Sequence, residues 1–285
     1  MIKATTIKEV KENVREWKKQ GLTIGLVPTM GYLHEGHASL IKRARGECDK
    51  VIVSDFVNPI QFGPKEDLAT YPRDFDADCE LCEGLGTDLI FHPEPSEMYL
   101  EGFHSYVGVD TLSTELCGKS RPIHFNGVCT VVSKLFNITE ADKAYFGQKD
   151  AQQLAIVKRM VRDLNFNIEI IGCPIIREES GLAKSSRNTY LSEEEREKAL
   201  VLHKALTVGE EMVRSGEKDA NVVKKAVTDI IESEPLARVD YVEIVDWNEL
   251  QKVDKIDGPI LTAVAVYFGD KVRLIDNFIV EDAVK

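Results

Sequence analysis

Residues 27–41 read Val-Pro-Thr-Met-Gly-Tyr-Leu-His-Glu-Gly-His-Ala-Ser-Leu-Ile, and this stretch decides the fold. The apolar and partly β-branched run at residues 22–27 leads into it and predicts a buried strand. Residues 40–45 place apolar side chains at helical spacing among basic ones, which predicts an amphipathic helix. The turn between them contains a proline and two glycines. Because free N–H groups and the positive end of the helix dipole meet at such a helix start, we expect an anion-binding site there.

Two histidines, His34 and His37, stand near the start of this expected helix and can face the same anion. Such a pair is common by chance, but its place at the carboxyl end of an expected first strand, where open α/β sheets bind ligands, favours a function. A zinc site is the alternative, yet the spacing is not the His-Glu-x-x-His of zinc proteases and no third ligand is obvious. The stretch is not a Walker loop, because no Gly-Lys-Ser/Thr follows.

A second strand–glycine–helix unit occupies residues 143–164. Lys149 lies at its expected helix start, where the positive dipole end repels a cation, and a bound phosphate would remove this conflict. Gln153 follows near the same mouth, and Gln61 lies in a loop after the expected strand at residues 51–57. A glutamine amide both donates and accepts hydrogen bonds, which suits a hydroxy acid.

Composition and charge exclude several classes of protein. The 285-residue chain has a formal net charge of −12, which disfavours binding to nucleic acid or to an anionic membrane. No apolar run reaches the length of a membrane span, and the N-terminus lacks the apolar core of a signal peptide. We therefore expect a cytoplasmic protein with six reduced cysteines, of which Cys79 and Cys82 pack on a helix.

Strands and helices alternate up to about residue 175, which is typical of a parallel sheet covered by helices. The three strands expected near the C-terminus have no helix between the last two, which indicates an antiparallel sheet. The fold class is therefore α/β: a Rossmann-like, doubly wound parallel sheet at residues 1–175, followed by a smaller α+β domain at residues 176–285. The strands expected in the first domain are residues 22–27, 51–57, 87–91, 143–146 and 167–172, with a further edge strand at 105–109.

Two capping boxes mark helix starts. Thr6 with Glu9 opens a helix that we interpret as scaffold, and Ser192 with Glu195 opens a long charged helix that we expect to run to about Arg214. A further helix is expected at residues 220–232. Before the second box, residues 181–188 form a loop with two hydroxyls and two cations, which is able to close over a triphosphate as lids do.

Four segments resemble one known family, in order and across nearly the whole chain. Residues 28–37 resemble the signature of the pantothenate synthetases, members of the nucleotidyltransferase superfamily that includes the class I aminoacyl-tRNA synthetases. Residues 56–62 and 146–153 match further segments of the family. Residues 185–188 resemble its Ser-Ser-Arg-Asn segment, the counterpart of the lysine–serine loop of class I synthetases.

The resemblance implies an ATP-dependent ligase that joins (R)-pantoate to β-alanine and releases (R)-pantothenate, AMP and pyrophosphate. The pantoate carboxylate would attack the α-phosphorus of ATP to give pantoyl adenylate, and the amine of β-alanine would then displace AMP. The family further implies Mg²⁺, a homodimer, nucleotide and pantoate binding by residues 1–175, and a lid formed by residues 176–285. Two alternatives stay open: another adenylyl- or cytidylyltransferase, which would lack the paired glutamines, and a non-catalytic nucleotide-binding regulator, which would lack some phosphate-binding cations.

The family also implies roles for residues of this chain. The catalytic set that holds the phosphates would be His34, His37, Lys149, Ser186 and Arg187, with His37 as a proton donor. Gln61 and Gln153 would orient pantoate. The ATP site would comprise Met30, Gly31, Tyr32, Leu33, His34, Glu35, Gly36, His37, Gly147, Gln148, Lys149, Asp150, Ile176, Lys184, Ser185, Ser186 and Arg187.

Three residues depart from the family pattern. Asp55 replaces an apolar residue, and a carboxylate in a buried strand needs a partner or an exposed strand end. Ile123 replaces a glycine, so we expect a different loop backbone, which weakens any role for His124. Lys184 replaces Met or Leu, and we expect its methylenes to lie on the apolar wall with the ammonium in solvent. The alternative is that its ammonium reaches the triphosphate as a point charge beside Arg187.

Overall fold

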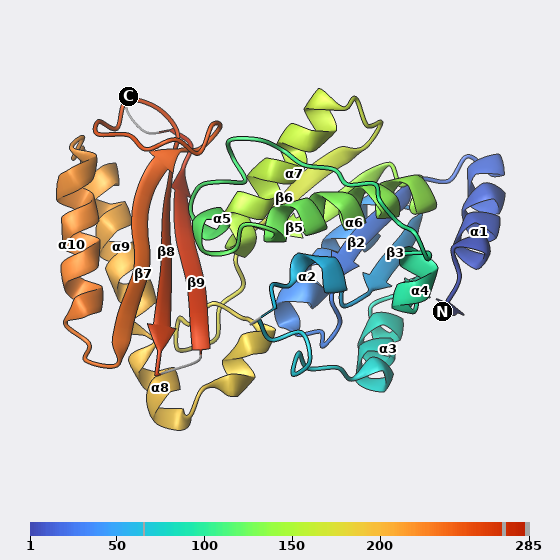
Figure 1. Cartoon of the computed structure of the whole chain (residues 1–285), viewed down its shortest axis with the longest axis horizontal. Coiled ribbons are helices and arrows are strands. Elements are labelled where there is room, and N and C mark those ends of the chain that lie inside the picture. The colour runs from blue at the N-terminus through green and yellow to red at the C-terminus, as the bar shows by residue number, and fades with distance from the viewer. Residues whose placement is uncertain (65, 270–271, 283–285) are drawn as a thin grey trace.

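The computed structural model describes residues 1–64, 66–269 and 272–282. It contains two sheets, and the N-terminus lies at the end of the molecule opposite the C-terminal helices (Figure 1). The larger sheet has six strands in the order β1-β4-β3-β2-β5-β6, and all its pairings are parallel. These strands are β1 (Ile2–Ala4), β2 (Ile24–Thr29), β3 (Lys50–Asp55), β4 (Leu89–Phe91), β5 (Lys143–Gly147) and β6 (Glu169–Cys173).

The helices of this part of the chain come mostly between its strands. They are α1 (Ile7–Lys19), α2 (Glu35–Glu47), α3 (Phe75–Gly84), α4 (Pro95–Met98), α5 (Cys117–Ser120), α6 (His124–Thr139) and α7 (Ala151–Asp163). Two short 3₁₀ turns, η1 (Pro59–Gln61) and η2 (Gln148–Asp150), follow β3 and β5.

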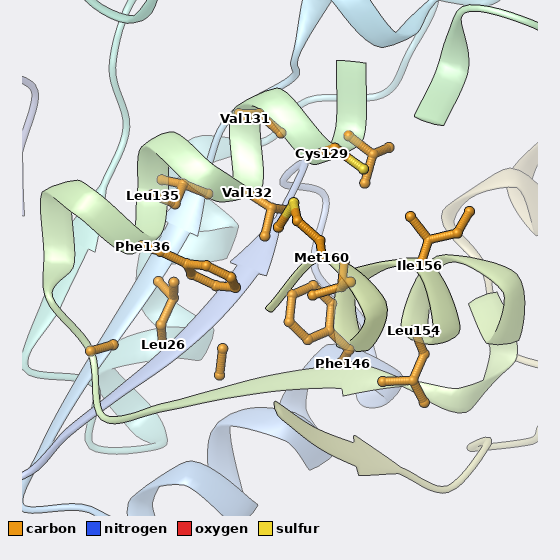
Figure 2. Packing of buried hydrophobic residues seen from close by; sticks show 14 of the residues in the cluster. Leu26, Cys129, Val131, Val132, Leu135, Phe136, Phe146, Leu154, Ile156 and Met160 are labelled. Carbon is orange, nitrogen blue, oxygen red and sulfur yellow. The ribbon is translucent and has the colours of Figure 1, made fainter. Parts of the chain in front are cut away.

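Successive residues of a strand point to opposite faces of the sheet, and helices pack on both faces of the larger sheet. Leu26 of β2 belongs to a core cluster with α1, α6 and α7, whereas its neighbour Val27 belongs to a cluster with α2 and α3. Figure 2 shows the first of these layers, in which side chains of α6 and α7, among them Phe136 and Met160, face the sheet near Leu26. Burial on both faces explains why β2 and β3 are nearly continuous apolar runs.

The smaller sheet is antiparallel, with the order β7-β8-β9. One face packs on the two long C-terminal helices, and the other contributes residues such as Leu261 and Ala263 to the core of the larger unit (Figure 1). The elements of this part are η3 (Ser186–Tyr190), α8 (Glu193–Lys198), α9 (Val201–Arg214), α10 (Ala220–Glu232), β7 (Ala237–Asp246), β8 (Ile260–Phe268) and β9 (Val272–Val280).

The predicted fold class is confirmed: a parallel, helix-covered sheet precedes a smaller unit with an antiparallel sheet. Both capping boxes are present, with Thr6 and Ser192 as the N-caps. The helix predicted at residues 220–232 has those bounds. The boundary predicted near residue 175 stays a prediction; β6 ends two residues before it.

Three predictions of local structure were wrong. Residues 105–109 form no strand, because the Val107 N–H donates to the side chain of Thr130 on α6 instead of to a neighbouring strand. The expected first strand is the second along the chain, because β1 pairs with β4 at the sheet edge. The helix expected from Ser192 to Arg214 breaks at Ala199 and Leu200: every residue of α8 is at least partly exposed, whereas α9 buries an apolar stripe.

The described residues include no helix with the length and apolar character needed to cross a membrane.

Candidate active site

A cavity of about 230 Å³ lies where β2 and β5 end. The turn before α2, the turn η2 and the loop before η3 form its polar side, and α6 supplies apolar residues. Most residues predicted from the sequence line it: Met30, His34, Gly36, His37, Gln61, Gly147, Lys149, Asp150, Gln153, Ile176, Lys184, Ser185, Ser186 and Arg187. Five others predicted for ATP binding are not among its described lining residues: Gly31, Tyr32, Leu33, Glu35 and Gln148.

The turn after β2 has an uncommon backbone that a carboxylate holds in place. Gly31 and the non-glycine Tyr32 both have positive φ, +75° and +52°. Asp78 of α3 accepts the N–H groups of Tyr32 at 2.7 Å and of Leu33 at 2.6 Å. A side chain at Gly31 would collide with Asp55 Oδ1, so both the sharp turn and this close approach require glycine there.

The two predicted histidines cap α2, and their hydrogen bonds fix the position of the ring proton. His34 Nδ1 accepts the N–H of Gly36 at 3.1 Å, and His37 Nδ1 accepts the N–H of His34 at 3.3 Å. A ring nitrogen that accepts a hydrogen bond carries no proton, so the proton of each neutral ring is on Nε2. Each histidine therefore keeps one N–H donor for a ligand.

Both histidines are neutral at physiological pH. Burial, with the nearby charge of Lys149, lowers the pKa of His34 to about 4. Burial also holds the pKa of His37 well below its usual value, and the nearby charge of Lys149 acts in the same direction. Neutral imidazole donates a hydrogen bond without adding charge. Among the described residues, the positive groups that line the cavity are therefore Arg121, Lys149, Lys184 and Arg187.

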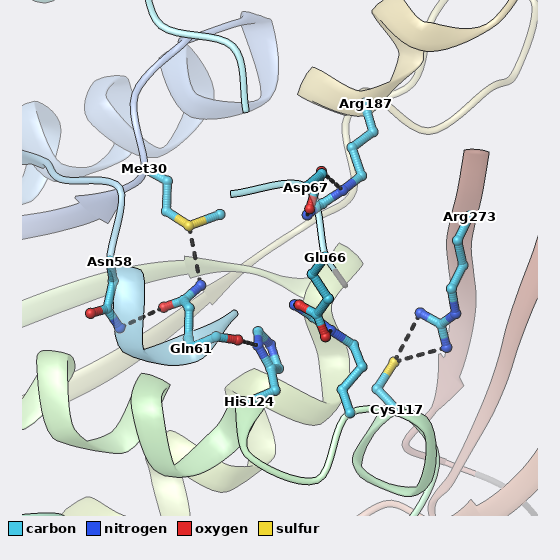
Figure 3. A network of polar contacts seen from close by, with 10 residues as sticks. Met30, Asn58, Gln61, Glu66, Asp67, Cys117, His124, Arg187 and Arg273 are labelled. Carbon is cyan, nitrogen blue, oxygen red and sulfur yellow. Dashed lines mark hydrogen bonds and ion pairs between the residues drawn. The ribbon is translucent and has the colours of Figure 1, made fainter. Parts of the chain in front are cut away.

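Gln61 sits in a fixed position at the side of the cavity (Figure 3). Its Oε1 accepts Asn58 Nδ2 at 2.9 Å, and its Nε2 lies 3.1 Å from Met30 Sδ. Asn58 is held in turn by Tyr99, whose hydroxyl donates to Asn58 Oδ1 at 2.6 Å. Gly127 is required beneath this turn, because a Cβ there would lie 2.5 Å from the Gln61 Cα. Sequence reasoning did not assign a role to Asn58, although it lies in a segment that matched the family.

His124 supports the same turn, although Ile123 differs from the family. Ile123 has φ −94°, which isoleucine adopts without strain, so the expected change of backbone is not required by its side chain. His124 Nδ1 lies 3.1 Å from the Gln61 carbonyl oxygen, to which it donates (Figure 3). Burial, with the charge of Arg121, lowers the pKa of His124 to about 4, so this ring is also neutral.

The cations predicted to bind phosphate are paired with carboxylates. Arg187 makes two hydrogen bonds of 3.0 Å to Asp67 (Figure 3). Lys149 Nζ lies 3.5 Å from Asp150 Oδ2. Lys184 Nζ lies 3.1 Å from Glu35 Oε2, so its ammonium pairs with the start of α2 and does not stand free in solvent as expected.

Asp55 is a buried carboxylate whose Oδ2 has no hydrogen-bond partner among the described residues. It is 3% exposed at the end of β3, where His92 Nδ1 lies 2.9 Å from its carbonyl oxygen and 3.4 Å from its Oδ2. Burial, with the nearby charge of Asp55, raises the pKa of Asp78 to about 6. Cys79 and Cys82 are packed in the core of this region, as predicted.

A second cavity, of about 830 Å³, adjoins the first and lies against the smaller sheet. Strands β8 and β9 line one side of it, and the chain around α5 and η2 lines the other. Arg273 of β9 approaches Cys117 of α5 across this space, with both terminal guanidinium nitrogens 3.6 Å from the sulfur (Figure 3). The two cavities share Arg121, His124, Lys149, Asp150, Gln153, Ser185 and Arg187, so they form one continuous cleft.

Fold and site together define an α/β protein with a cleft of polar and basic side chains at the carboxyl edge of a parallel sheet, where proteins of this class bind ligands. The model of the pantoate–β-alanine ligase family matches residues 3–279. The chain belongs to that family.

Named relatives support this assignment over the full length. The pantothenate synthetase of Clostridium botulinum (strain Loch Maree / Type A3) is 63% identical over 273 residues, which cover 96% of this chain and 97% of the relative. That of Ruminiclostridium cellulolyticum is 63% identical and covers 98% of both chains.

Solved structures support the same family assignment. A pantothenate synthetase from Thermus thermophilus is 44% identical and superposes with a TM-score of 0.92, covering 98% of this chain and 99% of that one. The pantoate–β-alanine ligase of Francisella tularensis, complexed with β-γ ATP and β-alanine, is 36% identical with a TM-score of 0.79 and covers 98% and 97%.

Proposed function

We propose that the continuous cleft carries out both steps of an adenylate-forming ligation. The protein condenses pantoate with β-alanine in an ATP-dependent reaction. In the first step a pantoate carboxylate oxygen bonds to the α-phosphorus of ATP and pyrophosphate leaves. In the second step the β-alanine nitrogen bonds to the acyl carbon and AMP leaves, while the amine gives up a proton.

The phosphates bind between two helix starts. His34 and His37 donate Nε2–H groups from the start of α2, and Lys149 reaches the same space from η2. Ser186 and Arg187 complete this set from η3. None of these residues forms a covalent bond to substrate, because the chemistry needs positioned donors and charge stabilisation in a protected site. His37 acts here as a neutral donor to phosphate.

Pantoate binds on the side of the cavity where Gln61 lies. The amide of Gln61 is fixed by Asn58, and Gln153 lines the same cavity from α7. The single observation that carries this assignment is that one cavity holds a fixed glutamine amide beside the neutral Nε2–H donors of His34 and His37.

We propose that Mg²⁺ binds to the protein together with the nucleotide. The described residues contain no group of three or more His, Cys, Asp or Glu side chains that could hold a metal ion on their own. This fits a Mg²⁺ ion held largely by phosphate oxygens and water, with Asp150 as the carboxylate that lines the cavity next to Lys149. Bound there, the ion would neutralise charge on the phosphates.

The remaining assignments follow the family. We place the nucleotide and pantoate sites in a domain of residues 1–175 and treat residues 176–285 as a second domain that closes the cleft. We also propose a homodimer in the cytoplasm. All six cysteines are buried and unpaired, which fits a reducing compartment.

The pantoate site is tested with Gln61→Ala. We expect the KM for pantoate to rise by about tenfold, the loss of one hydrogen bond worth ~1.4 kcal/mol, while the KM for ATP stays within about threefold. Gln251→Ala removes an exposed glutamine far along the chain and is the matched control. Equal weakening of pantoate and ATP would contradict the assignment, and a preference for another acid over pantoate would favour a different transferase.

A further inference from the structure

Asn277 of β9 connects the smaller sheet to the turn that carries Lys149. Its side-chain Nδ2 donates to the carbonyl oxygens of Gln148 at 3.0 Å and of Lys149 at 2.9 Å. Both hydrogens of the amide are therefore used on consecutive residues of η2. Asn277 is 4% exposed, so water does not compete for these bonds.

The neighbouring residue anchors Asn277 itself. Asp276 is 3% exposed and receives two hydrogen bonds from Arg177, at 2.6 and 3.0 Å. Arg177 lies in the segment after β6 and also donates to the Gly181 carbonyl oxygen at 3.1 Å. Asp276 Oδ1 accepts the Asn277 N–H at 2.8 Å. The position of the Asn277 amide is thus set by a buried ion pair next to it in the strand.

We propose that Asn277 is a positioning residue for the adenylation step, acting through Lys149. This inference rests on the proposed function, in which Lys149 binds the phosphates of ATP. The ammonium of a lysine is carried by a flexible four-carbon stem, so its placement depends on how firmly its backbone is held. Asn277 holds that backbone from a different sheet.

The chemistry of the contact requires an amide at this position. Two carbonyl oxygens face the side chain, and an amide NH₂ supplies the two donors that satisfy them. A carboxylate of the same size would place acceptors against acceptors. An alanine would leave both carbonyl oxygens without their partner in a buried place. Either change is expected to let η2 shift while β9 keeps its pairing with β8.

The proposal gives the smaller sheet a part in phosphate binding. Strand β9 lines the larger cavity on one side and contacts η2 directly. A movement of this sheet relative to the larger one therefore moves the Lys149 backbone as well. Closure of the cleft and placement of the lysine become one event.

A double-mutant cycle tests the proposal, using pyrophosphate–ATP exchange with pantoate on the full-length wild type, Asn277→Ala, Lys149→Ala and the double variant. We expect Asn277→Ala to lower kcat by about ten- to a hundredfold, the loss typical of a catalytic group displaced by ~1 Å, with the KM for pantoate within about twofold. In the Lys149→Ala background, Asn277→Ala should change kcat by less than about twofold, because its target is gone. Asn221→Ala, on an exposed position of α10, is the control.

If the kcat losses of Asn277→Ala and Lys149→Ala multiply in the double variant, Asn277 does not act through Lys149, and the proposed role of Lys149 still stands. Wild-type exchange by Lys149→Ala would remove the lysine from the proposed function and the positioning role with it. Full activity of Asn277→Ala would overturn the positioning role alone. If Asn277→Ala does not fold, Asn277→Asp has the same size and enters the same cycle with the same expected results.

Discussion

Arg187 reaches the cleft already paired with a carboxylate. Its guanidinium makes two hydrogen bonds to Asp67 and lies 5.6 Å from the centre of the Tyr71 ring. Such a bidentate pair matches the geometry that arginine offers to a phosphate. If Arg187 binds the triphosphate as we propose, Asp67 competes for the same donors, and nucleotide binding must displace Asp67 or share Arg187 with it.

This competition predicts that Asp67→Asn binds ATP more tightly. An asparagine keeps the shape but lacks the charge, so Arg187 becomes available to phosphate. We expect the KM for ATP to fall by about three- to tenfold, which is ~0.7–1.4 kcal/mol. Asp76→Asn removes one negative charge from an exposed position of α3 and controls for net charge. An unchanged or higher KM for ATP in Asp67→Asn would show that Asp67 orients Arg187 instead of competing for it.

Among single residues, the sequence indicated those whose hydrogen-bond partners are close in the chain. His34 and His37 cap the helix on which they lie, and the pattern around them is local. Asp78 and Asn277 could not be found this way. Asp78 contacts Leu33 across 45 residues, and Asn277 contacts Gln148 across 129. Nothing in the local pattern of either residue indicates the segment that it holds.

The start of α6 supports the side of the cavity where Gln61 lies, which we propose binds pantoate. His124 is 8% exposed and donates to the Gln61 carbonyl oxygen, while Gly127 one turn later allows η1 to approach the helix. Burial, with the charge of Arg121, keeps the pKa of His124 at about 4. The ring therefore stays neutral in the folded protein over a range in which an unfolded chain would protonate it.

This difference predicts an acid-dependent loss of stability. Between the ordinary histidine pKa of 6.5 and the folded value of about 4, the unfolded state binds a proton that the folded state does not. The contribution of His124 to the free energy of unfolding is fully present above about pH 7 and is lost as the pH falls. At 1.36 kcal/mol per pKa unit, His124 should account for about 2 kcal/mol of unfolding free energy lost between pH 7.5 and 5.

Denaturant unfolding of the wild type and of His124→Gln at both pH values measures this contribution. Glutamine can still donate to the Gln61 carbonyl oxygen but does not titrate, so the variant should lose about 2 kcal/mol less than the wild type over this range. Parallel losses in the two proteins would mean that His124 takes up a proton in the folded state.

Sequence patterns predicted elements well where one rule decided the outcome. The parallel sheet followed from apolar runs alternating with helices, and both capping boxes are present. The predictions failed where tertiary contacts compete with local preference. Residues 105–109 contact α6 instead of pairing with a strand. Helix α8 has no buried residue, whereas α9 buries an apolar stripe, so no shared packing surface keeps the two as one helix.

At the scale of the whole molecule, the cleft lies between two sheets, and both contribute to it. The larger sheet presents the turns before α2 and α7, whereas β9 holds η2 and lines the outer part of the cleft. The sequence could indicate two units from the change in strand and helix order. It could not indicate that Asn277 of the second unit holds η2, the turn that we propose binds phosphate, because that contact depends on how the units pack.

We propose that this cleft activates pantoate by adenylation before the amine reacts. This order of steps is tested by exchange of labelled pyrophosphate into ATP, measured with the purified protein, Mg²⁺ and pantoate. We predict that exchange requires pantoate and Mg²⁺ and proceeds in the absence of β-alanine, because pyrophosphate leaves in the first step. Exchange that appears only when β-alanine is added would contradict the account.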